Sequence, residues 1–260
     1  PLDGPDTLIA FDSEDPTNWW TVGSMGVPNI GFGGLDFDRD GNLWAFASFY
    51  KHTGGAASGL YRVDISTGEA TLQGARPATQ SLQDMAFNPV DGRLYGINSQ
   101  NNVSRLYTID MVSGAVSAVG VFTGMPTSQH VMSLAIDSTG NFYIHELNGD
   151  KIYKGAGLAL TELYQLPQDT NFSQGMTIDW SRDDRGYHGA VGYGVHPNYF
   201  SQLNQFAADG SEYVLGAEFG PPLGDGLPPV EVGDLAIMPI PSPGAFVILG
   251  AAGLISRRRR

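Results

Sequence analysis

The chain has 260 residues, among them 35 glycines, 16 prolines and no cysteine, and its formal net charge is −13. This length allows one domain with a complete hydrophobic core, and the glycine and proline content is typical of short strands joined by tight turns. The lack of cysteine excludes disulfides and thiolate metal sites. The acidic charge excludes nucleic-acid binding through a basic surface, because basic residues cluster only at positions 257–260.

The N-terminal residues predict a strand hairpin. Residues 7–12 and 19–23 are rich in apolar and aromatic side chains, and the polar segment 13–17 between them indicates a turn. The sequence starts at Pro1 and contains no visible signal peptide, so we expect the N-terminus of a mature or truncated chain.

Residues 33–74 predict a four-stranded unit, made of a strand, an Asp/Gly turn and a strand over 33–46 and a hairpin over 60–74. Its inner strand recurs further along the chain at spacings of 50, 49, 42 and 59 residues. The equivalent positions are Leu35, Met85, Leu134, Met176 and Leu235. A four-stranded unit that repeats every 40–50 residues is typical of a β-propeller.

We therefore predict an all-β fold, a single β-propeller over 1–240 with five blades. Four blades are expected at about 33–74, 84–120, 133–165 and 175–216. The fifth is expected to close the ring by pairing 234–237 with the N-terminal strands in 7–23, and it would have three strands.

The turns and hairpins of these blades resemble those of secreted YVTN/SMP-type propellers over most of 33–216. The turn Asp38–Trp44 has the form Asp-x-x-Gly-Asn-Leu-aromatic, and Tyr107–Gly114 has the form Tyr-x-Ile-Asp with a following Gly turn. The resemblance implies the blade architecture and names no ligand.

The last 20 residues have a different organisation. A Pro/Gly breaker is followed by the uncharged apolar run 245–256 and then by four arginines. A helix over 244–256 would be about 20 Å long, short of the ~30 Å hydrocarbon core, so we expect a marginal membrane anchor. Basic residues after it would stay on the cytoplasmic side, which leaves the rest of the chain outside.

This tail resembles the PEP-CTERM class of bacterial sorting signals, in a planctomycete-like variant with Ser in place of the central Glu. The motif residues are Pro241, Ser242, Pro243 and Gly244, and the basic cluster is Arg257, Arg258, Arg259 and Arg260. The resemblance implies export across the inner membrane, transient anchoring by the short C-terminal hydrophobic helix, and processing by an exosortase-type enzyme. It implies a final location at the cell surface or outside the cell.

Two patterns suggest metal chemistry. Asp36–Gly41 imitates the start of an EF-hand calcium loop, but the twelfth position is Ala47 instead of Glu, and a blade hairpin explains the same residues. His145 and His188 fall on the second strands of consecutive blades, so they are expected near each other in the ring. We assign no catalytic residue, no metal ligand and no cofactor, and calcium stays an alternative.

The candidate ligand site follows from the architecture, because residues next to each inner strand surround one mouth of the central channel. The candidates are Gln83, Asp84, His130, Gln174 and Asp234. The expected loop 186–201 also holds Tyr193, His196, Tyr199 and Phe200, and exposed aromatic residues of this loop could stack on sugars.

The sequence thus predicts an exported, surface-sorted propeller that acts as a binding or structural module of the cell envelope or the extracellular polysaccharide matrix. Its expected partners are an exosortase-type enzyme and an extracellular polysaccharide or surface protein. The alternative is a propeller hydrolase or lyase with a metal or carboxylate site at the central channel.

Overall fold

The computed structural model describes residues 5–50, 59–74, 81–126, 130–167, 169–171, 175–192, 201–216, 234–239, 246–250 and 253–256. Every regular element in these ranges is a β-strand, so the predicted all-β class is confirmed. None of the described residues forms a helix long and apolar enough to cross a membrane.

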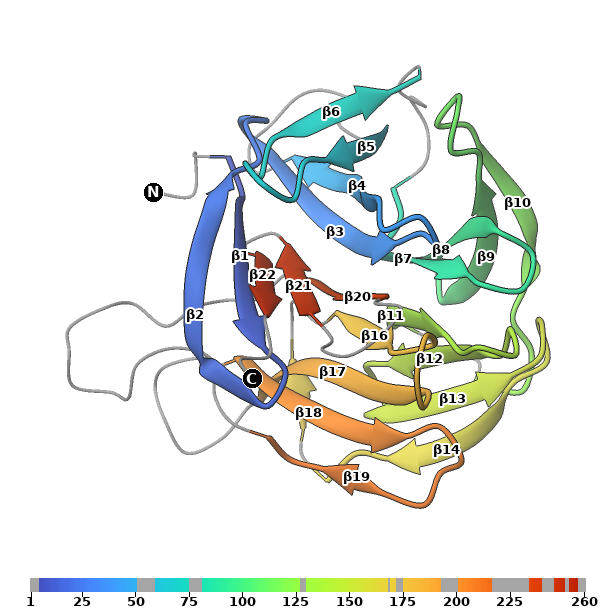
Figure 1. The fold of residues 1–260 in the computed structure, drawn as a ribbon. Helices are drawn as coiled ribbons and strands as arrows, with labels where there is room; N and C mark the ends of the chain where they lie inside the picture. Colours follow the sequence, from blue (N-terminus) through green and yellow to red (C-terminus); the bar gives the residue numbers. More distant parts are fainter. Residues whose placement is uncertain are drawn as a thin grey trace.

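Four antiparallel sheets form the blades of a propeller (Figure 1). The first blade consists of β3 (Ile30–Phe37), β4 (Leu43–Tyr50), β5 (Gly59–Val63) and β6 (Ala70–Gln73). The second consists of β7 (Asp84–Asn88), β8 (Arg93–Gln100), β9 (Val103–Ile109) and β10 (Val116–Val121). The third consists of β11 (Val131–Ile136), β12 (Phe142–Glu146), β13 (Lys151–Gly155) and β14 (Thr161–Gln165).

The fourth blade has two short strands on its inner side. It consists of β15 (Thr170–Asn171), β16 (Met176–Ile178), β17 (Arg185–Gly192), β18 (Ser201–Ala207) and β19 (Tyr213–Val214), and both β15 and β16 pair with β17. Strand β17 continues to Gly192, so the first part of the loop expected over 186–201 is strand instead.

A fifth sheet joins the two ends of the chain. Its strands are β1 (Thr7–Asp12), β2 (Asp15–Ser24), β20 (Asp234–Met238), β21 (Phe246–Gly250) and β22 (Gly253–Ser256), in the order β2-β1-β22-β21-β20. Strand β20 contacts both β16 and β3, which places it in the ring of inner strands β3, β7, β11 and β16 (Figure 1).

The C-terminal helix predicted over 244–256 is not confirmed, because the described residues of this segment are the strands β21 and β22. Strand β21 pairs with β20 on one side, through Ala236 and Ile248, and with β1 on the other, through Ala10 and Ile248. An apolar run with β-branched residues suits a strand, and here it covers two sheet edges whose backbone groups would otherwise lack partners. The motif 241–244 and the block 257–260 lie outside the described residues.

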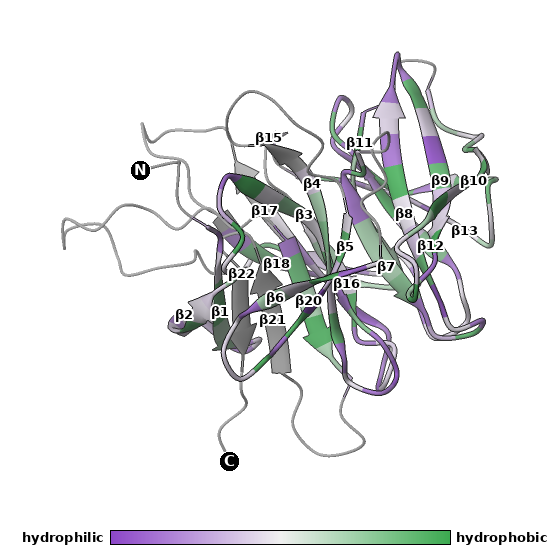
Figure 2. Ribbon diagram, turned by 90° about the horizontal axis from the view of Figure 1, so that it is seen from above, coloured by the Kyte–Doolittle hydropathy of each residue, from purple (hydrophilic) through white to green (hydrophobic). Residues whose placement is uncertain are grey.

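Hydrophobic cores fill the spaces between neighbouring blades. The second and third blades share a cluster that includes Tyr95, Leu134 and Phe142, and the third and fourth share one that includes Tyr143, Met176 and Phe206. Figure 2 shows hydrophobic residues along the strands and hydrophilic ones in many of the connecting turns. This pattern explains why each inner strand has Leu or Met at its repeated position.

Aspartates close the hairpins between the first and second strands of a blade. Asp137 accepts hydrogen bonds from the backbone N–H groups of Thr139 (3.0 Å) and Asn141 (2.9 Å), and from the Tyr143 hydroxyl (3.0 Å). Asp38 binds its own turn in the same way and accepts a bond from Trp44 Nε1 at 2.9 Å. The EF-hand-like residues therefore form a blade turn, in which the Asp38 oxygens bind the protein itself.

We expect Asp137→Ala to lower the free energy of unfolding by roughly 3 kcal/mol, because several donors around a buried turn lose their acceptor. Asp110→Ala is the matched control, since the Asp110 side chain caps an exposed hairpin by accepting hydrogen bonds from Val112 and Ser113. Urea denaturation of both variants measures the difference. Equal losses for the two variants would contradict the role given to Asp137.

Candidate functional site

The inner strands pack directly against one another at the centre of the ring. A Cβ on Gly34 would lie 2.8 Å from the backbone nitrogen of Met85 in the next blade, and a Cβ on Gly175 would overlap the backbone of Leu235. Glycine at these two positions allows neighbouring inner strands to approach this closely.

Three buried aspartates lie on these inner strands: Asp36 on β3, Asp84 on β7 and Asp234 on β20. Asp36 accepts hydrogen bonds from Phe37 N at 2.8 Å and from Phe87 N, in the next blade, at 2.7 Å.

Asp84 repeats this arrangement one blade further on. It accepts bonds from Met85 N and from Leu134 N, both at 2.6 Å. Each of these two carboxylates therefore connects its own strand to the inner strand of the following blade.

Asp234 differs from the other two. Its Oδ1 accepts a hydrogen bond from Leu235 N at 2.7 Å, whereas its buried Oδ2 has no hydrogen-bond partner among the described residues. Sequence reasoning named Asp84 and Asp234, and the structure brings them together.

Burial raises the pKa of all three carboxyl groups. Burial raises the pKa of Asp36 to about 7, against the opposing effect of the hydrogen bonds from Phe87 and Phe37. Burial also raises the pKa of Asp84 and of Asp234 well above the usual range; the charge of Asp36 raises both further, and the charge of Asp84 adds to the effect on Asp234.

Two other predicted site residues, Gln83 and His130, make their described hydrogen bonds elsewhere. Gln83 accepts a hydrogen bond from Ser99 N at 2.9 Å, and exposed His130 uses its backbone N–H to bond Glu146. The described residues do not include the remaining candidates, which are Gln174, Tyr193, Tyr199 and Phe200. Sequence reasoning missed Asp36 as a central carboxylate because it assigned the segment Asp36–Gly41 to a turn. Its place on an inner strand, shared with Asp84 and Asp234, was the available signal.

A second buried polar cluster lies between the third and fourth blades. The rings of His145 and His188, which the repeat pattern placed near each other, have centroids 4.6 Å apart and are edge-to-face. His145 Nε2 lies 3.2 Å from Thr170 Oγ1, and His188 Nδ1 lies 2.9 Å from the Tyr213 hydroxyl. Burial lowers the pKa of His188 to about 3, so this side chain is neutral at neutral pH.

The histidine pair belongs to no metal-binding group in the described part of the chain. Among the residues that the structure describes, no group of three or more His, Cys, Asp or Glu side chains is placed to hold a metal ion. The two histidines thus pack at a blade interface as polar residues within the protein.

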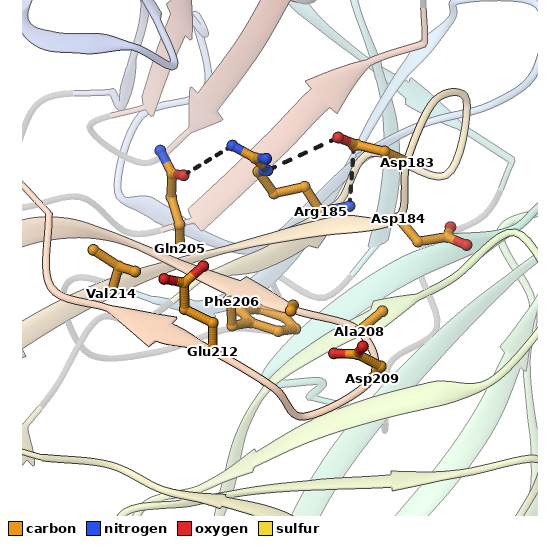
Figure 3. Close-up of a pocket in the computed structure, with 10 residues that line it drawn as sticks. Asp183, Asp184, Arg185, Gln205, Phe206, Ala208, Asp209, Glu212 and Val214 are labelled. Carbon is orange, nitrogen blue, oxygen red and sulfur yellow. Dashed lines mark hydrogen bonds and ion pairs between the residues drawn. The ribbon is translucent and has the colours of Figure 1, made fainter.

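The outer part of the fourth blade contains a pocket of about 390 Å³ (Figure 3). Its base is formed by residues of β18 and the following turn, and its rim carries charged side chains. The charged lining residues are Asp183, Asp184, Arg185, Asp209 and Glu212.

The pocket offers both hydrogen-bond donors and acceptors. The Arg185 guanidinium lies between Asp183, at 3.9 Å, and Gln205 Oε1, at 3.4 Å, above the ring of Phe206 (Figure 3). Hydrogen bonds from Ser211 lower the pKa of Asp209, which keeps this carboxylate ionised at neutral pH. Such a mixture over an apolar base suits a ligand with many hydroxyl groups.

The fold and its centre define the class of protein, a β-propeller. The chain resembles a chain in a crystal structure of a nidogen/laminin complex, with 14% identity, a TM-score of 0.55, and coverage of 93% of this chain and 84% of that one. It also resembles the GH74 xyloglucanase from Xanthomonas campestris, with 13% identity, a TM-score of 0.52 and coverage of 99% of this chain. The match covers 53% of the xyloglucanase chain, about half of its length.

Residues 46–198, more than half of the sequence, match a family model described as a repeat of unknown function, DUF6923. The chain belongs to that family. No curated protein matches the sequence significantly.

Neutral His188 should make the protein less stable in acid. Its pKa is lower in the folded chain than in the unfolded chain, so the unfolded chain takes up the proton first as the pH falls below about 6.5. We expect this residue to remove about 1.4 kcal/mol of stability per pH unit between about pH 6.5 and its folded pKa.

The measurement is chemical denaturation of the wild type and His188→Asn at several pH values. The difference in unfolding free energy between the two should shrink steadily as the pH falls. His130→Asn, which removes an exposed histidine, is the matched control. A difference that stays constant with pH would contradict the assignment.

Proposed function

We propose that this protein is an exported β-propeller sorted to the cell surface, where it acts as a binding or structural module of the cell envelope or extracellular polysaccharide matrix. The main observation in favour of a binding or structural module is that the central carboxylates already bind backbone groups of the protein. Asp36 and Asp84 direct their oxygens to backbone N–H groups of their own and the next blade. They therefore act as connections between blades.

A hydrolase that worked at the centre would need these oxygens for its substrate. General acid or base catalysis requires a carboxyl group within hydrogen-bonding distance of the reacting atom, and glycoside hydrolysis requires two such groups on either side of the bond. Close packing at Gly34 and Gly175 also brings backbone into the space next to the inner strands. Both features favour a ligand site elsewhere on the propeller.

The pocket on the fourth blade is the best candidate for that ligand site. Its guanidinium, carboxylates and amide could hydrogen-bond the hydroxyl groups of a polysaccharide, and Phe206 gives it an apolar base. Propellers of similar fold include a chain from a protein–protein complex and an enzyme named for xyloglucan, so the fold accommodates either kind of partner.

The alternative function is a hydrolase or lyase with a carboxylate or metal site at the centre. It is favoured by one observation, because a carboxyl group with a pKa of about 7, such as Asp36, is suited to general acid catalysis at neutral pH.

We also propose that the fifth sheet is the closing blade, so that the propeller has five blades. In this arrangement β20 is the inner strand and β1 and β2 are the outer strands, but the sheet has five strands instead of the predicted three, because β21 and β22 lie between β20 and β1. Its support is the contact of β20 with both β16 and β3.

The binding function is tested by calorimetric titration of the full-length protein with soluble neutral and acidic polysaccharides. We expect saturable binding to one of them. The double variant Asp209→Asn/Glu212→Gln, in which amides replace two pocket carboxylates, should bind that polysaccharide roughly tenfold more weakly or worse. Asp64→Asn, a change in an exposed hairpin of the first blade, is the control.

Release of reducing ends or unsaturated sugars would instead support the enzyme. In that case, Asp36→Asn should abolish product formation. Absence of both binding and products would leave a purely structural matrix protein.

The sorting function is tested in a host that contains an exosortase-type enzyme. Replacing Arg257, Arg258, Arg259 and Arg260 by Gln should remove the positive charge that retains the tail on the cytoplasmic side, so processing and surface location are lost. Replacement of the same residues by Lys keeps the charge and should preserve both. Cell fractionation and the mass of the mature protein are the measurements, and normal processing of the Gln variant would contradict the proposal.

A further inference from the structure

Asp234 occupies an unusual position at the start of β20. Its side chain is 1% exposed, and β20 contacts inner strands on both sides of the ring. Oδ1 accepts the hydrogen bond from Leu235, and Oδ2 is buried without a partner among the described residues. A buried carboxylate oxygen without a donor is costly, because its interaction with water has not been replaced.

The side chain of Asp234 interacts with another carboxyl group, that of Asp84. Asp84 is also 1% exposed, and it lies within hydrogen-bonding distance of Asp234. Both oxygens of Asp84 already accept backbone N–H groups, from Met85 and Leu134. Two carboxyl groups can hydrogen-bond each other only when one of them carries a proton.

The strands packed against the pair bring a further negative charge close to it. The third carboxylate, Asp36 on β3, adds negative charge, whereas β11, β16, β21 and β22 carry no titratable residue. The remaining titratable residues on the strands packed against β7 and β20 are Tyr50 on β4, Arg93 and Tyr95 on β8, and Arg185, Tyr187 and His188 on β17. The largest charge effects on this pair come instead from carboxyl groups, Asp36 on Asp84 and both Asp84 and Asp36 on Asp234.

We propose that Asp84 and Asp234 share one proton, which fastens the last inner strand of the propeller to the centre of the ring and is released as the pH rises. The proton resides on Oδ2 of Asp234, the oxygen without another partner, and is donated to the carboxylate of Asp84. When it leaves to solvent, two buried anions face each other and β20 loses this attachment. Strand β20 is the last inner strand before the segment 241–260, so this proton controls how firmly that end of the ring is held.

The expected pH dependence has a definite sign. The folded chain holds this proton more tightly than the unfolded chain, in which an aspartate has a pKa of about 3.9. The stabilisation is therefore complete below that pH and is lost as the pH rises through the titration of the folded pair.

The test compares the melting temperatures of three full-length proteins from about pH 5 to about pH 9 in the presence of a chelator. In Asp234→Asn the amide N–H is a permanent donor to Asp84. This variant should melt roughly 3–6 °C above the wild type at the alkaline end, and the difference should shrink toward acid pH. Asp84→Asn should melt lower at every pH, because an amide NH₂ would face the backbone N–H of Met85 or Leu134.

Infrared spectroscopy provides a second readout that does not depend on stability. The wild type should show the carbonyl band of a buried protonated carboxyl group at a pH where exposed carboxyl groups are ionised, and Asp234→Asn should show a weaker band. Asp64→Asn, which changes an exposed aspartate, should leave the band and the melting profile unchanged.

Two results would overturn the proposal. One is an Asp234→Asn variant that is destabilised equally at all pH values. The other is a wild-type protein whose alkaline loss of stability is reversed by calcium, because a cation would then occupy the place given to the proton. Neither result bears on the binding function, which is measured separately at the pocket.

Discussion

The close packing of inner strands around one centre is the constraint on which the rest of the structure depends. Neighbouring inner strands approach until a side chain at Gly34 or Gly175 would collide with the next blade. At such distances the backbone N–H groups near the centre cannot reach water, so they need acceptors inside the protein. Asp36 and Asp84 supply those acceptors and thereby connect each inner strand to its neighbour.

This solution places negative charge where burial is most costly. Each carboxylate gains hydrogen bonds to backbone groups, but burial raises the pKa of all three, and the charges of Asp84 and Asp36 raise the pKa of Asp234 further. Asp234 has one oxygen without such a bond. At β20, therefore, fewer hydrogen bonds offset the repulsion between buried carboxylates than at β3 or β7. The His145–His188 contact solves a related problem at a blade interface, where polar rings are buried beside apolar clusters.

The same constraint separates structural polar groups from those free to bind a ligand. At the centre, the aspartates serve the backbone of neighbouring blades. On the outer part of the fourth blade, Arg185, Asp209 and Glu212 surround an open pocket and keep much of their hydrogen-bonding capacity for solvent or a ligand. This contrast is the physical basis for placing ligand binding on the outside of the propeller.

The sequence by itself determined the all-β class, the repeating four-stranded unit and the adjacency of His145 with His188. These follow from alternating apolar residues and fixed repeat spacing, which are local properties of the chain. Only the tertiary structure decided that Asp36 joins Asp84 and Asp234, that Gln83 and His130 do not, and that residues 246–250 pair as a strand with β1 and β20. Those outcomes depend on which residues face each other after the ring closes, and the repeat spacing does not specify these particular contacts.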